Sequence, residues 1–193
     1  AYCSFSSYPL SVWEKQVDNY LDALCKEIEA ASTMMGNKKL LTFYMGGGTP
    51  TTLSSPQMKE LLRAIKDSFD LSRCLEFTVE GGRPDTLDEE KLRVIHDGGA
   101  TRISINPQTM ADDVLAAVGR KHTAAQTVEA FRQARAVGFE DINMDLIAGL
   151  PEDTPEKFSA SLSQVLALNP SNVTVHTLAL KKGAALFGSR MEL

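Results

Sequence analysis

Three consecutive glycines, Gly46–Gly48, followed by Thr49, Pro50 and Thr51, form the segment best suited to direct contact with a ligand. Glycine has no Cβ atom, so the backbone of such a turn approaches a bound molecule closely. Its N–H groups suit a carboxylate, and its carbonyl groups suit an ammonium group. A tight strand-to-helix turn is the alternative interpretation, but one glycine would be enough for that.

Single carboxylate and amide side chains occur in similar settings. Glu80 stands before two glycines and could receive an amine or a ribose hydroxyl, or serve as a helix cap. Asn143 and Asp145 alternate within an otherwise apolar segment. Burying a carboxylate costs several kcal/mol unless it is hydrogen-bonded. Asp145 therefore either holds a ligand hydroxyl or belongs to a structural polar layer, and Gln108 has the same two interpretations.

Two basic features each have two interpretations. The segment Arg120–His122 offers positive charge, either as a solvated basic turn or as a contact for a carboxylate. His176 lies inside a predicted strand, where a lone histidine is more often a packed residue than a ligand.

Composition limits the class of protein. The chain has 193 residues, 43% hydrophobic and 23% charged, which is ordinary for a globular domain. A net charge of -5 argues against a dominant role in nucleic-acid binding, which needs a basic surface. No apolar run is long enough for a membrane span. The three cysteines Cys3, Cys25 and Cys74 are widely spaced and cannot all pair, so a reducing cytoplasm fits best.

The elements around these residues alternate between strand and helix. Strands are predicted over residues 40–45, 75–79, 102–105, 142–147 and 173–180, and helices over 11–34, from 55, over 87–96, 111–118, 123–137 and 154–169. Regular alternation predicts the α/β class, with a parallel sheet and right-handed crossovers. Each predicted strand ends in one of the unusual segments. Because ligands of parallel α/β proteins bind at the carboxyl ends of the strands, we expect one shared site there.

Local signals predict several element boundaries. Ser11 and Glu14 have the spacing of a capping box at the start of the first helix, and Thr123 has the same relation to Gln126. Ser55 is predicted as the N-cap of the second helix. The apolar run of residues 40–45 is typical of a strand that is buried on both faces.

Together these residues resemble a known family. Tyr2-Cys3 is similar to the end of the Cys-x-x-x-Cys-x-aromatic-Cys loop of radical S-adenosylmethionine enzymes. Four further segments resemble the oxygen-independent coproporphyrinogen III oxidase group of that superfamily, namely Gly46–Thr51, Val79–Glu80, Asn106–Gln108 and Asn143–Pro151. Arg102–Met110 and Val175–Leu180 look closest to its Firmicutes-type coproporphyrinogen dehydrogenase branch.

The resemblance implies a fold and a domain. It predicts a partial (β/α)6 barrel in which residues 1–193 form a radical SAM core domain. The chain opens at Ala1 without a methionine, and we interpret it as a fragment that is truncated before the first strand of the barrel and lacks the C-terminal substrate region. One cysteine of the expected three cannot hold a cluster, so the fragment alone is expected to be inactive.

The resemblance also implies two cofactors, a [4Fe-4S] cluster and S-adenosylmethionine. Cys3 would be a cluster ligand, and Tyr2 would lie against the cofactor. Gly47, Gly48 and Thr49 would contact the methionine moiety. The other positions that match cofactor-site residues of the family are Glu80, Gln108, Arg120, Asp145 and Ala179.

The implied activity is that of a cytoplasmic oxidoreductase. A 5′-deoxyadenosyl radical would take hydrogen from a propionate side chain of coproporphyrinogen III, and loss of carbon dioxide would leave a vinyl group. Two rounds would give protoporphyrinogen IX. The implied partners are the porphyrinogen and a reducing electron donor such as flavodoxin or ferredoxin.

Two other hypotheses stay open. Phe5 stands where oxidases of the group carry a further cysteine, and related haem chaperones lack that cysteine too. A haem-binding trafficking protein on the same scaffold is therefore the first alternative. The second is a generic α/β barrel that binds a nucleotide-like ligand, with Cys3 as an ordinary thiol.

Overall fold

The computed structural model describes residues 10–36, 38–179 and 184. Its centre is one parallel sheet of five strands, β1 (Thr42–Met45), β2 (Glu76–Glu80), β3 (Arg102–Gln108), β4 (Asp141–Ala148) and β5 (Asn172–Thr177). The strands lie in their chain order, each hydrogen-bonded to the next. The predicted α/β class, the parallel sheet and the five strands are thus confirmed.

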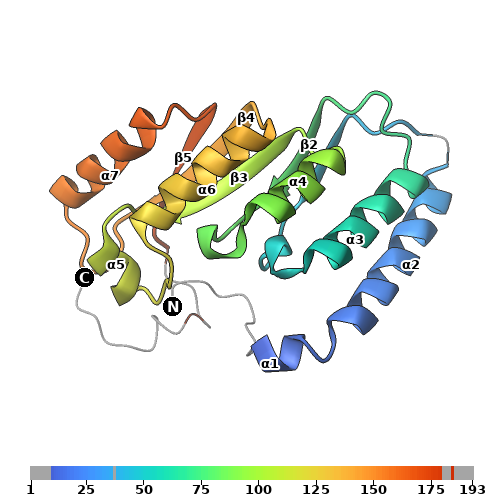
Figure 1. The fold of residues 1–193 in the computed structure, drawn as a ribbon, viewed down its shortest axis with the longest axis horizontal. Coiled ribbons are helices and arrows are strands. Elements are labelled where there is room, and N and C mark those ends of the chain that lie inside the picture. Colours follow the sequence, from blue (N-terminus) through green and yellow to red (C-terminus); the bar gives the residue numbers. More distant parts are fainter. Residues whose placement is uncertain (1–9, 37, 180–183, 185–193) are drawn as a thin grey trace.

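The connections are mostly helical. The helices are α1 (Leu10–Trp13), α2 (Val17–Met35), α3 (Ser55–Ser68), α4 (Glu89–Asp97), α5 (Asp112–Ala117), α6 (Ala124–Val137) and α7 (Pro155–Ala167). Short 3₁₀ turns, η1 (Pro50–Thr52) and η2 (Pro84–Thr86), follow β1 and β2. Figure 1 shows α2, α3, α4, α6 and α7 lined up along one side of the sheet.

The two faces of the sheet differ in chemistry because side chains alternate along a strand. One row packs against the helices and is apolar: Phe77 is 2% exposed, and Ile103 and Met144 are fully buried. The strand registers place the other row together, and it is polar on every strand, with Tyr44, Glu76, Thr78, Glu80, Arg102, Ser104, Asn143, Asp145, Asn172, Thr174 and His176. Polar side chains on a sheet face need hydrogen-bond partners. This face therefore carries the side chains that are candidates for binding a ligand.

Capping explains where several helices begin. The predicted capping box of Thr123 and Gln126 is present at the start of α6, and Gly138, with a positive φ of 120°, ends that helix. The predicted cap of α3 was wrong by one residue. Ser54, not Ser55, has the extended backbone of an N-cap and exchanges hydrogen bonds with Gln57.

The predicted helix over residues 11–34 is two helices. Ser11 lies inside α1, so the capping box predicted for it was wrong. The chain turns at Gln16, whose N–H donates to the Trp13 carbonyl, and α2 starts at Val17. The residues between Trp13 and Val17 are polar and exposed, so no buried side chain holds that turn in a helix.

The first strand was also predicted incorrectly in one respect. Residues 40–45 are not buried on both faces, because Leu41 is 56% exposed and Tyr44 is 61% exposed. In the described part of the chain, β1 is an edge strand that pairs with β2 alone. An apolar run reports the hydrophobicity of a strand but not its place in the sheet.

The buried Thr51 and the partly buried Lys91 join the turn after β1 to the turn after β2. The Thr51 hydroxyl is fully buried, donates to the Gly81 carbonyl at 2.8 Å and lies 2.6 Å from the Thr86 hydroxyl. The Lys91 ammonium of α4 donates to the carbonyls of Thr51 at 2.8 Å and Thr86 at 3.3 Å. These contacts hold the glycine turn against the end of β2.

Replacing Thr51 with valine is expected to destabilise the protein by about 1.5 kcal/mol, because the substitution removes a buried hydroxyl that bonds the Gly81 carbonyl and the Thr86 hydroxyl. The matched control is Thr52→Val at the exposed neighbouring position, which should change stability by less than about 0.5 kcal/mol. Urea unfolding measures both. Equal losses would show that the hydroxyl of Thr51 does not join the two turns.

Candidate functional site

We call the carboxyl ends of β1 to β4 and the turns that follow them the polar rim. Glu80, the last residue of β2, lies at its centre. Its carboxylate accepts hydrogen bonds from the Tyr44 hydroxyl (3.4 Å), from the Asn106 side-chain amide (3.2 Å) and from the Gly47 N–H. Partial burial raises the pKa of Glu80 above its usual range, and the nearby Asp145 adds to the rise, whereas the Gly47 and Tyr44 donors oppose it. Glu80 is therefore a half-buried carboxylate held in one orientation beside the glycine turn.

This raised pKa predicts a pH-dependent effect of Glu80→Gln. A carboxyl whose pKa is higher in the folded than in the unfolded chain costs stability as it ionises. That cost begins near the ordinary value of 4.5 and is complete above the raised pKa. The stability of the variant relative to the unsubstituted protein should therefore increase from pH 4 to pH 7.

Urea unfolding at several pH values measures this difference. Glu27→Gln, at an exposed position of α2, is the matched control for the loss of one carboxylate. A difference for Glu80→Gln that varies with pH no more than that of the control would contradict a raised pKa at the Glu80 carboxyl.

The three glycines of the turn have three different environments. A Cβ on Gly46 would collide with the Tyr44 ring and approach Glu80 Oε2 to 2.9 Å. Gly47 has a positive φ of 119°, a conformation that favours glycine. Gly48 has no positive φ, and a Cβ built on it would meet no described atom within 4 Å. The fold therefore explains Gly46 and Gly47 but gives no reason for Gly48, which borders open space.

Tyr44 is a site residue that sequence reasoning missed. It lies on the polar face of β1, two residues before the glycine turn, and its hydroxyl reaches Glu80. Burial, followed by the charge of Glu80, raises the pKa of Tyr44, so the phenol stays protonated and donates. The period of two in a strand could have found it, because Tyr44 faces the same side as the next strand's Glu80.

An irregularity in β3 shapes the middle of the rim. The pairing with β4 shifts between Ile105 and Gln108, where Pro107 lacks a backbone N–H. Gln108 has a positive φ of 71° and is 7% exposed. Its Oε1 atom is buried and has no hydrogen-bond partner in the described part of the chain. An orphaned buried acceptor suits a ligand that brings a donor.

His122 supports this irregularity. Its side chain is buried, and Nε2 lies 3.2 Å from the Pro107 carbonyl, which can only accept, so Nε2 carries the proton. Burial, with a contribution from Arg120, lowers the pKa of His122. The imidazole is thus neutral, and the predicted positive charge of the Arg120–His122 segment does not include His122.

Arg120 and Thr49 meet the rim at Gly82. Arg120 Nη1 donates to the Gly82 carbonyl at 3.2 Å. The Thr49 methyl group lies 3.5 Å from the position of a Cβ on Gly82. The turns after β1 and β2 and the loop before α6 are therefore in contact, as the shared-site prediction requires.

Asp145 occupies the β4 side of the polar face. Asn143 Nδ2 donates to Asp145 Oδ1 at 2.6 Å, and the exposed His176 of β5 places Nε2 4.0 Å from Asp145 Oδ2. Only 18% of the Asp145 side chain is exposed. Asp145 and the glycine turn lie on one face and are linked through Glu80, not at opposite ends of the sheet.

The remaining predicted positions divide into two groups. Ala179 is exposed, two residues beyond the end of β5. Tyr2 and Cys3 lie outside the described residues, so their predicted contacts stay predictions.

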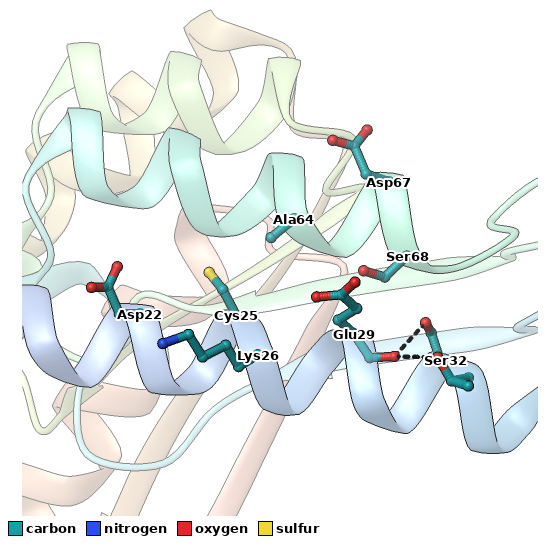
Figure 2. Close-up of a pocket in the computed structure, with 9 residues that line it drawn as sticks. Asp22, Cys25, Lys26, Glu29, Ser32, Ala64, Asp67 and Ser68 are labelled. Carbon is teal, nitrogen blue, oxygen red and sulfur yellow. Dashed lines mark hydrogen bonds between the residues drawn. The ribbon is translucent and has the colours of Figure 1, made fainter.

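A separate cavity of about 600 Å³ lies between α2 and α3, in the helical layer (Figure 2). Its lining includes Cys25 and the carboxylates Asp22, Glu29 and Asp67. Burial, followed by the charges of Glu60 and Asp22, raises the pKa of Cys25. The thiol is therefore protonated, and this cavity has none of the features of the rim.

The described residues fit one implied cofactor better than the other. The open space at Gly48, the orphaned Gln108 oxygen and the oriented Glu80 carboxylate suit a zwitterionic ligand such as S-adenosylmethionine. For an iron–sulfur cluster, no group of three histidine, cysteine or acidic side chains with suitable geometry occurs among the residues described. Cys74 lies before β2, and its thiol donates a hydrogen bond to the Glu76 carbonyl at 3.3 Å. Cluster ligation therefore depends on Cys3 and stays a prediction.

The fold and the rim define a class of protein, a parallel α/β protein with a small-molecule site at the carboxyl ends of its strands. The sequence matches the radical SAM superfamily over residues 1–165, so the chain belongs to that superfamily. Enzymes of the superfamily use S-adenosylmethionine and a [4Fe-4S] cluster, which supports both predicted cofactors at the level of the superfamily.

Individual relatives support the predicted group. The chain is 40% identical to the oxygen-independent coproporphyrinogen-III oxidase-like protein HemZ of Bacillus subtilis, over 96% of this chain and 38% of HemZ. It is 38% identical to the heme chaperone HemW of the same organism, over 93% of this chain and 47% of HemW. The solved structure of coproporphyrinogen III oxidase HemN from Escherichia coli matches with a TM-score of 0.79 and 31% identity, over 85% of this chain and 38% of that chain.

These comparisons confirm the resemblance to the coproporphyrinogen oxidase group and the partial barrel. The chain spans less than half the length of these three relatives. The relatives carry both oxidase and chaperone names, so they support the superfamily and the group but not one activity. Within the described residues, no helix has the length and apolarity that a bilayer crossing requires.

Proposed function

We propose that this chain is the adenosyl-binding core of a radical SAM oxidoreductase that acts on coproporphyrinogen III. The observation that carries the proposal is the rim at the ends of β1 to β4, where the glycine turn, Glu80 and Asp145 are joined by hydrogen bonds. The similarity to HemN, described as a radical SAM coproporphyrinogen III oxidase, supports the substrate class. We further propose that residues 1–193 act as one core domain.

The residues of the rim have distinct roles in this proposal. The backbone of the glycine turn and Glu80 bind the amino-acid end of S-adenosylmethionine, since amides suit a carboxylate and carboxylates suit an ammonium group. Asp145 accepts from a ribose hydroxyl, and Gln108 Oε1 accepts from a further donor of the cofactor. When bound together, S-adenosylmethionine and the cluster would supply the radical chemistry that removes hydrogen from the substrate. The protein orients the reacting atoms and excludes water.

Product analysis tests the proposal. The intact protein, purified without oxygen and reconstituted with iron and sulfide, is incubated with S-adenosylmethionine, a reductant and coproporphyrinogen III. Formation of 5′-deoxyadenosine together with a porphyrinogen that has lost two carbon dioxide molecules is expected. Absence of 5′-deoxyadenosine under reducing conditions would contradict the enzyme assignment.

A second candidate is a haem-trafficking protein on the same scaffold. Phe5 in place of a further cysteine and the 38% identity to HemW favour it. Titration with haem separates the two. Tight binding of haem in a fixed stoichiometry, without porphyrinogen turnover, would replace the oxidase proposal by this one.

The setting of the reaction belongs to the same proposal. A flavodoxin or ferredoxin is the proposed electron donor, because reductive cleavage of a sulfonium needs a low-potential electron. A reducing cytoplasm is the proposed location, since Cys25 and Cys74 are free thiols and such thiols persist in reducing compartments.

A further inference from the structure

Five side chains of the polar face form a continuous line of hydrogen bonds across three strands. We call Glu80, Asn106, Ser104, Asn143 and Asp145 the polar chain. Asn106 Nδ2 donates to Glu80 (3.2 Å), Ser104 Oγ to Asn106 Oδ1 (2.7 Å), and Asn143 Nδ2 to both Ser104 Oγ (2.9 Å) and Asp145 (2.6 Å). The polar chain ends in a carboxylate at each end, Glu80 on β2 and Asp145 on β4.

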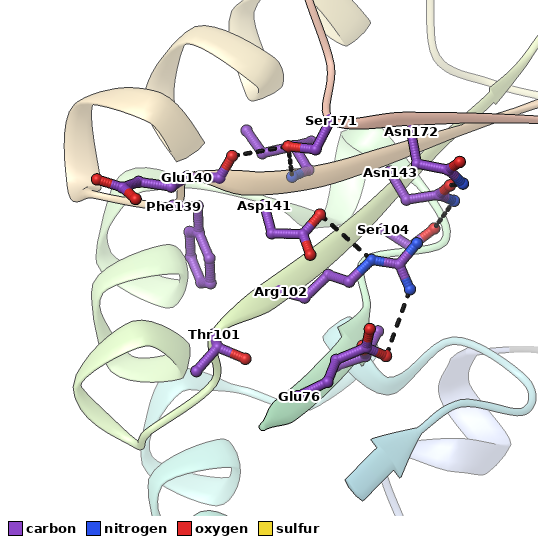
Figure 3. Close-up of polar contacts among 12 residues, drawn as sticks. Glu76, Thr101, Arg102, Ser104, Phe139, Glu140, Asp141, Asn143, Ser171 and Asn172 are labelled. Atoms are coloured by element: carbon purple, nitrogen blue, oxygen red, sulfur yellow. Dashed lines mark hydrogen bonds and ion pairs between the residues drawn. The ribbon is translucent and has the colours of Figure 1, made fainter. Parts of the chain in front are cut away.

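The orientation of Asn143 is fixed by β5. Its Oδ1 accepts from Asn172 Nδ2 at 2.5 Å (Figure 3). It also accepts from Thr174 Oγ1 at 3.1 Å. A reversed amide would set its oxygen against the Asp145 carboxylate and its NH₂ against that of Asn172. Both hydrogens of Asn143 must therefore point to Ser104 and Asp145.

The orientation of Asn143 fixes the orientation of each further member of the polar chain as far as Glu80. The Ser104 hydroxyl accepts from Asn143, so its single hydrogen goes to Asn106 Oδ1, and the NH₂ of Asn106 must then face Glu80. The exposed fractions of Ser104, Asn106 and Asn143 are 4%, 4% and 5%, so bulk water cannot replace a missing partner. The hydrogens on Asn143, Ser104 and Asn106 that take part in the polar chain therefore have a single arrangement.

We propose that Ser104 and Asn143 are positioning residues that couple Glu80 to Asp145, so that the two carboxylates of the rim bind a ligand as one unit. Without the Ser104 hydroxyl, the Asn106 amide is free to reverse and to set its oxygen against Glu80. The proposal rests on the proposed function in one respect, namely that the rim binds S-adenosylmethionine.

A double-mutant cycle in two backgrounds tests the coupling. Glu80→Gln, Asp145→Asn and the double variant are made in the unsubstituted protein and in Ser104→Ala. Affinity for S-adenosylmethionine is measured by equilibrium dialysis on the intact, reconstituted protein. In the first background the two losses should depart from additivity by about fivefold, and in Ser104→Ala they should be additive within about twofold.

Ser104→Ala suits this test because Ser104 touches neither carboxylate. The matched control is Ser161→Ala, since Ser161 is also buried and its Oγ bonds the Met110 N–H and the Thr109 hydroxyl, outside the polar chain. The control background should keep the fivefold coupling. Equal coupling in all three backgrounds would overturn the proposal, as would losses that are additive in the unsubstituted protein.

A second measurement needs no cofactor. In the cluster-free protein, Asp145→Asn should shift the side-chain amide NMR signals of Asn106, one strand away, and this shift should vanish in Ser104→Ala. An unshifted Asn106 signal would overturn the coupling. If S-adenosylmethionine does not bind at all, the proposed function fails, while the NMR result still decides the coupling.

Discussion

Replacing Gly48 with alanine is expected to weaken S-adenosylmethionine binding about 30-fold while leaving the stability of the protein unchanged. The backbone of Gly48 is not left-handed, and an added Cβ would meet no described atom within 4 Å. The substitution therefore costs the fold nothing. The methyl group would instead fill the open space at the glycine turn that the cofactor is proposed to occupy. Equilibrium dialysis and urea unfolding measure the two effects separately.

Gly46→Ala provides a contrasting variant at the same turn. Its Cβ would collide with the Tyr44 ring and Glu80, which are movable ends of side chains and not backbone. Stability should fall by less than about 1 kcal/mol, but Glu80 would be displaced and binding lost. Gly48→Ala with unchanged affinity would show that the third glycine serves only the turn.

The order of elements could be predicted from the sequence because its signals are local. Thr123 and Gln126 form their capping box with residues three positions apart, and Gly138 ends the same helix through its own backbone. The placement of Glu80 at a strand end follows from one boundary in the chain. Predictions of this kind need no knowledge of distant contacts.

Properties that depend on neighbouring strands could not be predicted in the same way. The exposure of Tyr44 follows from the edge position of β1, and its contact with Glu80 spans two strands. The polar chain requires the registers of β2, β3 and β4 and the irregularity at Pro107. Asn143 could be assigned to a polar face from its spacing, but its partners could not.

The contacts of Arg102 also depend on neighbouring strands and could not be predicted from the sequence. Its guanidinium joins three strands, with Nη1 3.5 Å from Glu76 Oε1 in β2 and Nε 3.4 Å from Asp141 Oδ1 in β4 (Figure 3). The Arg102 side chain is only 19% exposed. Nothing in the spacing of these residues along the chain indicates that they meet.

Arg102→Met is expected to lower the free energy of unfolding by about 1–2 kcal/mol, because Glu76 and Asp141, 43% and 45% exposed, then remain on the polar face without this counter-charge. Arg93→Met is the matched control. Arg93 also pairs with a carboxylate, Glu89, but both side chains are 58% exposed, so the loss should stay below about 0.5 kcal/mol. Urea unfolding of both variants measures the difference.

Neutralising the partners separates charge from packing. Adding Glu76→Gln and Asp141→Asn to Arg102→Met should recover at least half of the lost stability, since an amide pair does not repel as two carboxylates do. If the triple variant is no more stable than Arg102→Met, the arginine contributes through its aliphatic stem and not through its charge. Recovery would instead show that this ion-pair group holds the amino-terminal halves of β2, β3 and β4 together beneath the rim, so that the polar chain lies on a sheet of fixed register.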